Sequence, residues 1–227
     1  WERDVHYPPN PAYPTLLAQA ERRSFTAAIE HRLNDKTSLF GDFMYSINET
    51  ETVLNAQPVS GTVAANHPFN PFNVAVTARN RFLPYPRIYA NESTSTRGVF
   101  GIKGKFFDAW SYEAAGNFNR VTHHFRNYNL IDALKYTELT NTGAYNPFAR
   151  RQAAGVIESM SGTQQRDFLS TLRAWDARIN GPVFQLPGGA VQLGVGVSYT
   201  WERLDFQNDR NDQTGNWLQA TPRLPFK

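Results

Sequence analysis

The sequence contains no cysteine in its 227 residues. This absence excludes a disulfide framework and any metal site built from thiolates. No stretch approaches 18 consecutive apolar residues, which excludes a transmembrane helix. The Gly-x-Ser-x-Gly, Walker, His-Glu-x-x-His and dinucleotide-binding motifs are missing too, and the carboxylates are dispersed without a recognisable acid-base pair. We therefore expect no catalytic residue, no metal, no cofactor and no enzymatic activity.

Positive charge is neither abundant nor clustered. The net charge is +3, and Lys and Arg are scattered along the chain. Nucleic-acid binding usually requires a basic stripe on one face, so we expect no nucleic-acid partner. Trp1 is not an initiator residue, and no charged-then-apolar leader follows it. This predicts that the chain begins inside a longer or already processed protein.

What the sequence does have is period-two alternation of apolar and polar residues, arranged as three hairpins. Tight turns are predicted at Asn34-Asp35-Lys36, Asp108-Ala109 and Pro187-Gly188-Gly189. The predicted strands lie near residues 22–33, 37–48, 95–107, 110–123, 167–186 and 190–206. The remaining long segments, predicted as loops, are residues 49–94, 124–166 and 207–227. Short turns at one end and long loops at the other are typical of a transmembrane β-barrel.

The last predicted strand gives a length argument. Its apolar residues alternate over ten positions from Val191 to Trp201, which corresponds to roughly 33 Å. Tilted by about 40°, such a strand spans close to the 25 Å apolar band of an outer-membrane barrel. Strands in soluble sheets are usually only about five or six residues long.

Aromatic residues make up 14% of the chain and gather near the predicted strand ends. We interpret them as two membrane-interface girdles, although ordinary core aromatics are the alternative. The interface candidates are Phe106, Trp110 and Tyr112 near a short turn, and Phe118, Tyr199 and Trp201 towards the long loops. The apolar faces also carry glycines, which argue against a soluble core because such a core favours bulk. These glycines are Gly41, Gly98, Gly104 and Gly116.

The order of these segments resembles that of TonB-dependent outer-membrane receptors. Residues 21–51 resemble a barrel hairpin of this family that follows a long surface loop. Two loop segments resemble its recurring Asn-Pro-Phe motifs: HPFNPFNVAV at 67–76 and AYNPFARR at 144–151. Residues 184–206 are similar to a family hairpin in which a Leu-Pro-Gly-Gly turn enters an apolar strand. Each motif is common singly, and their order along nearly the whole chain carries the resemblance.

The resemblance implies an all-β, antiparallel, up-and-down transmembrane β-barrel segment of about six strands in the outer membrane of a Gram-negative-type bacterium. Barrels of 22 strands have a plugged lumen, so this chain is expected to be an internal fragment without the plug, the TonB box or the closing strand. The implied function is TonB-energised uptake of a scarce nutrient of the siderophore, cobalamin or saccharide class. The implied partners are that ligand, outer-membrane lipid and lipopolysaccharide, and TonB-ExbB-ExbD acting through the missing plug.

Five arginines follow the Asn-Pro-Phe segments and are the candidate residues of the ligand mouth. They are Arg79, Arg81, Arg87, Arg150 and Arg151. A charged vestibule would attract anionic ligands because clefts focus the electrostatic field. Contacts to lipopolysaccharide phosphates, or simple solvation, are the alternative interpretations.

Two further patterns contain possible metal ligands, but neither fits a metal site. Adjacent His123 and His124 should point to opposite faces of a strand and therefore not share an ion. QNDRNDQTGN at 207–216 is weakly similar to a calcium loop, but Gly215 falls one position late and the final Glu ligand is absent. A solvated extracellular loop is the preferred interpretation of that segment.

Two other functions stay open at this point. The first is a passive outer-membrane porin or adhesin barrel, which would work without TonB. The second is a secreted β-sandwich that binds glycans through Trp and Tyr.

Overall fold

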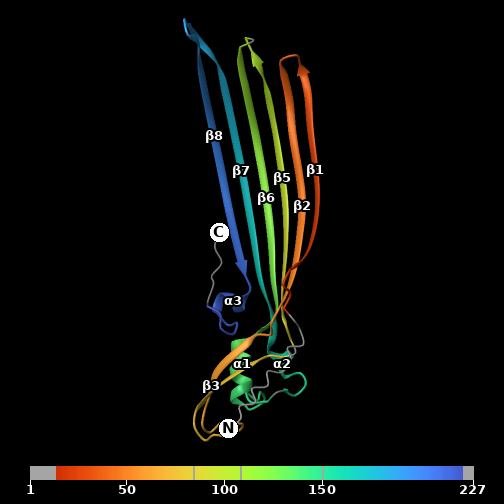
Figure 1. The fold of residues 1–227 in the computed structure, drawn as a ribbon, viewed down its shortest axis with the longest axis vertical. Helices are drawn as coiled ribbons and strands as arrows, with labels where there is room; N and C mark the ends of the chain where they lie inside the picture. Colours follow the sequence, from red (N-terminus) through yellow and green to blue (C-terminus); the bar gives the residue numbers. More distant parts are fainter. Residues whose placement is uncertain (1–13, 84, 108, 150, 222–227) are drawn as a thin grey trace.

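The protein is mostly antiparallel β-structure, with one long sheet and a smaller folded body at one of its ends (Figure 1). The computed structural model describes residues 14–83, 85–107, 109–149 and 151–221. Six strands form the main sheet in the order β1-β2-β5-β6-β7-β8. They are β1 (Gln19–Asn34), β2 (Thr37–Leu54), β5 (Arg87–Phe106), β6 (Trp110–Ile131), β7 (Ser161–Leu186) and β8 (Gly189–Asn208). Among the described residues β1 and β8 are open edges that do not pair with each other.

The three predicted hairpins are present, and their short turns lie together at one end of the sheet (Figure 1). Asp35 and Lys36 form the first turn, where the Asn34 side-chain oxygen accepts a hydrogen bond of 2.9 Å from the backbone N–H of Lys36. Pro187 and Gly188 form the third turn. Asp108, predicted for the second turn, lies outside the described residues. Asparagine, aspartate, proline and glycine favour tight turns, and the sequence predicts the turns for that reason.

The strands continue further towards the long loops than the alternation predicts. β5 begins at Arg87 rather than near 95, β6 ends at Ile131 rather than near 123, and β7 begins at Ser161 rather than near 167. The prediction that residues 49–94 and 124–166 are loops throughout is therefore wrong at their ends. These extensions carry polar residues on both faces, so they show no apolar alternation. The backbone ladder nevertheless continues because each strand has a neighbour of matching length.

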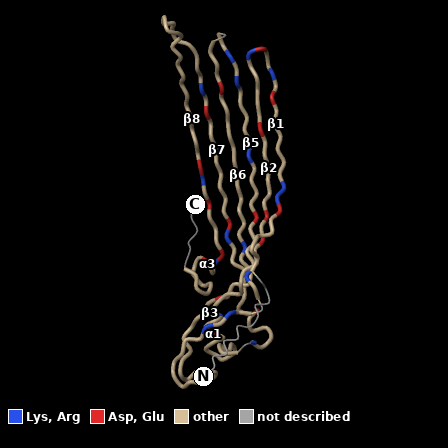
Figure 2. The backbone as a smooth tube through the Cα atoms, in the orientation of Figure 1, with Lys and Arg blue, Asp and Glu red and all other residues tan. Residues whose placement is uncertain are grey.

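The register places a continuous set of apolar residues from all six strands on one face. One row of directly paired residues crosses all six strands and contains no charged side chain. The row consists of Ile29, Gly41, Phe100, Gly116, Trp175 and Tyr199. In Figure 2, β8 has no charged residue from its turn to its loop-side third. The opposite face carries ion pairs such as Lys103–Glu30 and Arg178–Glu113.

No second layer covers the apolar face in the part of the chain that the structure describes. Large apolar side chains there are exposed, including Phe100, Trp175 and Val197. The buried hydrophobic residues lie instead at the loop end of the molecule. The fold is thus a long two-faced sheet whose apolar face has no protein core against it.

The loop end contains a hairpin and three short helices that the alternation does not predict. The hairpin consists of β3 (Pro58–Val63) and β4 (Val76–Arg81), which form a separate two-stranded sheet. The helices are α1 (Ala133–Asn141), α2 (Val156–Met160) and α3 (Arg210–Thr214). We call the two inter-hairpin segments, residues 55–86 and 132–160, the loop body. They contain the β3–β4 hairpin, α1 and α2.

Candidate functional site

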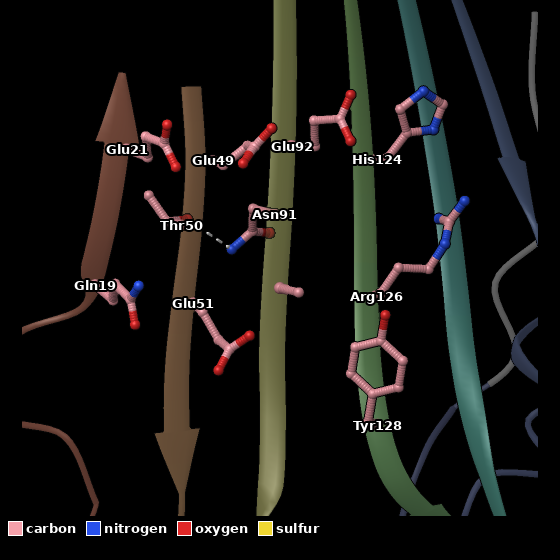
Figure 3. Close-up of a pocket in the computed structure, with 11 residues that line it drawn as sticks. Gln19, Glu21, Glu49, Thr50, Glu51, Asn91, Glu92, His124, Arg126 and Tyr128 are labelled. Atoms are coloured by element: carbon pink, nitrogen blue, oxygen red, sulfur yellow. Dashed lines mark hydrogen bonds between the residues drawn. The ribbon is translucent and has the colours of Figure 1, made fainter. Parts of the chain in front are cut away.

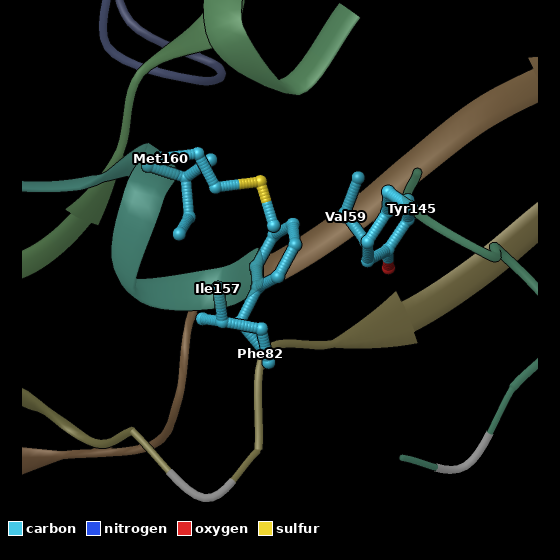
Figure 4. Packing of buried hydrophobic residues seen from close by; sticks show 6 residues of the cluster. Val59, Phe82, Tyr145, Ile157 and Met160 are labelled. Atoms are coloured by element: carbon cyan, nitrogen blue, oxygen red, sulfur yellow. The ribbon is translucent and has the colours of Figure 1, made fainter. Parts of the chain in front are cut away.

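The loop body has its own hydrophobic core, assembled from both long inter-hairpin segments. Its buried members are Val59, Phe82, Ile131, Tyr145, Ile157 and Met160. Figure 4 shows five of these side chains converging between α2 and the β3–β4 hairpin. The Phe82 ring packs against Tyr136 and Tyr145 at centroid distances of 5.9 Å and 5.8 Å. Such packing makes the loop body a folded unit that can position a binding surface.

The Asn-Pro-Phe segments predicted from the sequence fold as matching turns. The side-chain oxygens of Asn70 and Asn146 accept hydrogen bonds from the backbone N–H of Phe72 and Phe148, at 3.0 Å and 2.9 Å. The rings of Phe72 and Phe148 then meet edge to face, with centroids 6.3 Å apart. The side-chain nitrogen Nδ1 of His67 forms the same turn with the N–H of Phe69 at 3.2 Å. Proline fixes the backbone of each turn, and the Asn side chain closes it with a hydrogen bond. The contact between Phe72 and Phe148 then joins the two loops.

The four candidate arginines that the structure describes lie at the loop end, but they do not form one cluster. The guanidinium groups of Arg81 and Arg87 donate to the backbone carbonyls of Ala56 and Asn55, at 2.9 Å and 3.0 Å. Both therefore hold the segment between β2 and β3. Arg79 and Arg151 are exposed, and Arg150 lies outside the described residues. Of these arginines, only Arg87 lines a pocket described below.

That pocket opens where the polar face of the sheet meets the loop body, and it has a volume of about 200 Å³. Its polar lining consists of Gln57, Arg87, Asn127, Gln164 and Gln219. Its apolar lining consists of Pro58, Leu130, Trp217, Leu218 and Ala220. No carboxylate lines it. Asn127 and Gln164 are direct neighbours on β6 and β7, so the sheet register brings them together.

A buried acidic residue fixes the wall behind this pocket. Asp212 of α3 is 0% exposed and accepts hydrogen bonds from Arg166 and from the Gln164 side chain, the latter at 2.6 Å. Asp209 caps α3 by accepting from the N–H of Asp212. Part of segment 207–216 is therefore a buried structural element, and the prediction of a solvated loop is wrong for Asp212. The Asp-x-x-Asp spacing was the available signal, since a capping residue precedes a short helix.

Charged residues on the apolar face separate into an acidic and a basic half beyond the apolar band. Glu21, Glu49 and Glu92 are direct cross-strand neighbours in one row, which continues with His124. Figure 3 shows the carboxylates on β1, β2 and β5, opposite His124, Arg126 and Tyr128 on β6. His124 and Arg126 both contact Asp167, at 2.7 Å and 2.8 Å. The three carboxylates, His124 and Arg126 line a shallow hollow of about 540 Å³. Together with Asp167 they form what we call the charged belt.

The two adjacent histidines do point to opposite faces, as predicted. His124 lies on the face of the charged belt, whereas the His123 ring packs against Phe168 with centroids 5.9 Å apart on the other face. Within the described residues, no group of three or more His, Cys, Asp or Glu could hold a metal ion.

The interface candidates lie on the apolar face, in two groups. Near the turns, the ring of Phe106 stacks on Trp110 at 5.9 Å, and the Tyr112 hydroxyl lies 3.0 Å from the Thr37 hydroxyl. Towards the loops, Phe118 and Trp201 lie in the same row, one row beyond that of Tyr199. The guanidinium of Arg173 lies 5.4 Å from the Trp201 ring centre. Rings beside polar groups at both margins suit a boundary between apolar and aqueous surroundings.

Titratable groups in the loop body form one notable pair. The Tyr85 hydroxyl donates a hydrogen bond to Glu158. This bond raises the pKa of Tyr85 and lowers the pKa of Glu158, because it favours the neutral phenol and the ionised carboxylate. Burial in the core raises the pKa of Tyr145. None of these three groups belongs to the lining of the pocket that Arg87 and Asn127 share.

Comparison with known proteins does not identify the chain. No family model matches the sequence, and no curated protein matches it either. In the part of the chain that the structure describes, no helix has the length and apolarity needed to cross a membrane. The sequence does not predict the pocket residues Asn127, Gln164 and Gln219, because they are isolated polar residues outside any motif.

Proposed function

We propose that the six-stranded sheet is part of the wall of an outer-membrane β-barrel, with its apolar face towards lipid and its polar face towards the lumen. The observation that carries this proposal is the uncovered apolar row across all six strands. In water such a face would need a second layer, since exposed apolar patches of this extent mark interaction surfaces. Lipid supplies that layer. The open edges of β1 and β8 would each pair with a further strand, because bare strand edges do not occur in hydrocarbon.

The margin of the apolar band supports strand tilt. In the row that contains Phe25 and Tyr45 on β1 and β2, the positions on β6 and β8 are Arg120 and Arg203. The band therefore reaches further towards the loops on β1 than on β8. Near the turns the trend is the same, since Val191 on β8 lies beyond the last apolar position of β1. A slanted band is what strands tilted by about 35–45° produce.

Strand lengths agree with the same arrangement. β8 has 20 residues, which is roughly 65 Å of extended chain. This is more than an apolar band of about 25 Å requires, even with tilt. The loop-side parts of the strands would then stand above the membrane, which accounts for the charged belt around Glu49 and Asp167.

Within this architecture we propose a TonB-dependent receptor that takes up a scarce nutrient without transforming it chemically. The order of the hairpins and Asn-Pro-Phe turns supports this assignment. The folded loop body would form part of the ligand mouth on the outer side, and the short turns would face the periplasm. Lipopolysaccharide would contact the charged belt, and TonB would act through a plug. The candidate nutrient classes are a siderophore, cobalamin or a saccharide.

A matched pair of substitutions tests the membrane wall. Val197 is 70% exposed in the middle of the apolar band, and its neighbour Ser198 points to the polar face. Val197→Arg should cost about 2–4 kcal/mol at the bilayer midplane, whereas Ser198→Arg should be tolerated in an aqueous lumen. The measurement is the amount of heat-modifiable protein in the outer-membrane fraction of cells. Equal yields of both variants would overturn the proposal.

A second measurement separates the receptor from the alternatives. Nutrient uptake that stops in cells lacking TonB supports the receptor, whereas unchanged uptake indicates a passive porin and absence of uptake an adhesin. A chain that stays soluble without detergent would indicate the secreted glycan-binding β-sandwich. Against that last alternative, the two sheets among the described residues do not stack over the apolar band.

A further inference from the structure

Three exposed arginines gather on the apolar face of the sheet, at the loop-side margin of the apolar band. Arg120 of β6 and Arg203 of β8 are both direct cross-strand neighbours of Thr171 on β7. Arg173 lies two residues along β7 from Thr171, so it is a diagonal neighbour of both. Direct neighbours lie about 5 Å apart and diagonal ones about 7–8 Å apart. The three guanidinium groups therefore share one small area around Thr171, which we call the arginine patch.

The arginine patch begins where the apolar band ends. Arg173 is flanked in its own row by Phe118 and Trp201, and its guanidinium lies 5.4 Å from the Trp201 ring centre. The next row towards the turns, which contains Trp175 and Tyr199, has no charged residue. Tryptophan and tyrosine concentrate at the level of the lipid headgroups in membrane proteins. In the proposed wall, the three guanidinium groups thus lie at headgroup level.

The positive charge of the arginine patch is only partly balanced. Arg120 and Arg173 form no ion pair with a carboxylate in the part of the chain that the structure describes. Arg203 is paired through its Nε with Asp205 at 2.9 Å. Asp167 of the charged belt, two rows further towards the loops, is already paired within the belt. Three guanidinium groups therefore share one carboxylate, and the patch keeps a net positive charge.

The chemistry of the arginine patch selects an anion with several oxygen atoms. A guanidinium group donates parallel hydrogen bonds that match phosphate and carboxylate geometry. The half-buried Thr171 at the centre of the patch adds a hydroxyl donor. No acidic residue lies in the row of Arg120 and Arg203 on the three strands β6, β7 and β8, so an anion meets no repulsion within that row.

The neighbouring surface selects the source of that anion. On its turn side the arginine patch continues directly into exposed apolar side chains such as Trp175 and Val197. A free anion makes no use of such a surface, whereas a lipid places its acyl chains there and its headgroup beside the arginines. We propose that the arginine patch binds the phosphate group of a phosphorylated lipid of the outer leaflet, with the acyl chains along the apolar face. The inference rests on the proposed membrane wall and specifies one lipid partner of that wall.

The test measures binding of diphosphoryl lipid A to the full-length protein in a neutral detergent, by native mass spectrometry. Arg120→Gln should weaken binding severalfold. The double variant Arg120→Gln/Arg173→Gln should weaken it about tenfold or more, because hydrogen bonds to charged groups are lost. Lipid A from which the phosphates have been removed should bind the unmodified protein as weakly as the phosphorylated lipid binds the double variant. Inorganic phosphate at the same concentration should not displace the phosphorylated lipid.

The matched control is Arg97→Gln, which removes the same charge from the other face. Arg97 is also exposed, and its row on the polar face lies between the row of Arg173 and the row of Arg120. This variant should bind diphosphoryl lipid A like the unmodified protein. Because all three changed side chains are exposed, the variants should fold, and heat-modifiable migration on gels checks that they do.

Four results would overturn the inference. They are equal affinity of the double variant and the unmodified protein, equal affinity for lipid A with and without phosphates, displacement of the lipid by inorganic phosphate, and equal weakening by Arg97→Gln and Arg120→Gln. The third result would indicate a site for a free anion, and the fourth a general effect of net charge. The membrane wall fails independently, through the Val197→Arg and Ser198→Arg pair. A chain that stays soluble without detergent but binds lipid A through Arg120 would keep the arginine patch and discard the barrel.

Discussion

The loop body and the six-stranded sheet bury apolar side chains in opposite ways. In the loop body, Phe82 is 2% exposed and is surrounded by residues from β3, α1 and α2. In the sheet, Phe100 is 63% exposed although it lies in the middle of a continuous apolar row. The loop body is therefore stabilised by its own core, whereas the sheet depends on what surrounds it. Replacing an apolar environment by water should consequently destabilise the sheet and leave the loop body folded.

The largest expected effect tests the hydrophobic core of the loop body. Phe82→Ala should destabilise the loop body by about 3–5 kcal/mol, because it removes a buried ring and leaves a cavity. Phe72→Ala is the matched control, since Phe72 is 60% exposed. Urea titrations followed by hydrogen exchange of the loop-body amides report the loop body, and far-ultraviolet circular dichroism reports the strands. If both phenylalanines prove equally tolerant of alanine, the loop body has no functional core.

A smaller effect tests the packing of side chains on the apolar face of the sheet. A methyl group on Gly116 would lie 2.6 Å from the ring of Trp175, whereas one on Gly98 meets nothing within 4 Å. Gly116→Ala should therefore cost about 1–3 kcal/mol through overpacking. Gly98→Ala should be neutral or slightly stabilising, because glycine weakens a strand. Thermal denaturation in detergent measures both. Identical melting of the two variants would contradict lateral packing of rings over glycines.

Much of the sheet follows from the sequence, because alternation records which face of each strand is apolar. The alternation within each strand predicts its apolar face, and the register confirms this for Gly41 and Gly116, which lie in the apolar row. The sequence shows that glycines on the apolar face are unusual for a soluble core, but it does not show why glycine is needed at these positions. Only the register shows that Trp175 lies across Gly116 from the next strand.

The loop end was less predictable for a physical reason. The outer parts of β5 and β6 carry polar residues on both faces, so the apolar alternation stops there and the sequence predicts loops. The core of the loop body joins Val59 to Ile157 across about a hundred residues, a distance over which no local pattern acts. The Asn-Pro-Phe turns were recognised because proline and asparagine impose local geometry. Asn127 lacks such a signal, since the pocket that it lines is formed by five segments that lie far apart in the sequence.

The smallest expected effect concerns the edge of the loop body, where Tyr85 donates its hydroxyl hydrogen to Glu158. The pKa of Glu158 is lowered from its usual value near 4.5, so the bond stabilises the fold above that value and is lost as the pH falls through the lowered pKa. The pKa of Tyr85 is raised from its usual value near 10, so the same stabilisation is lost again as the pH rises through the raised pKa.

Tyr85→Phe should therefore leave the urea midpoint of the loop body nearly unchanged at acidic and strongly alkaline pH and lower it slightly between them. Both groups are solvent-exposed, which keeps the effect small because water screens such pairs. Tyr128→Phe serves as the control, since Tyr128 lies outside this pair. Urea midpoints measured across the pH range decide the matter. A Tyr85→Phe profile parallel to that of the unmodified protein would show that the hydrogen bond contributes nothing, and that the core around Phe82 alone holds the loop body together.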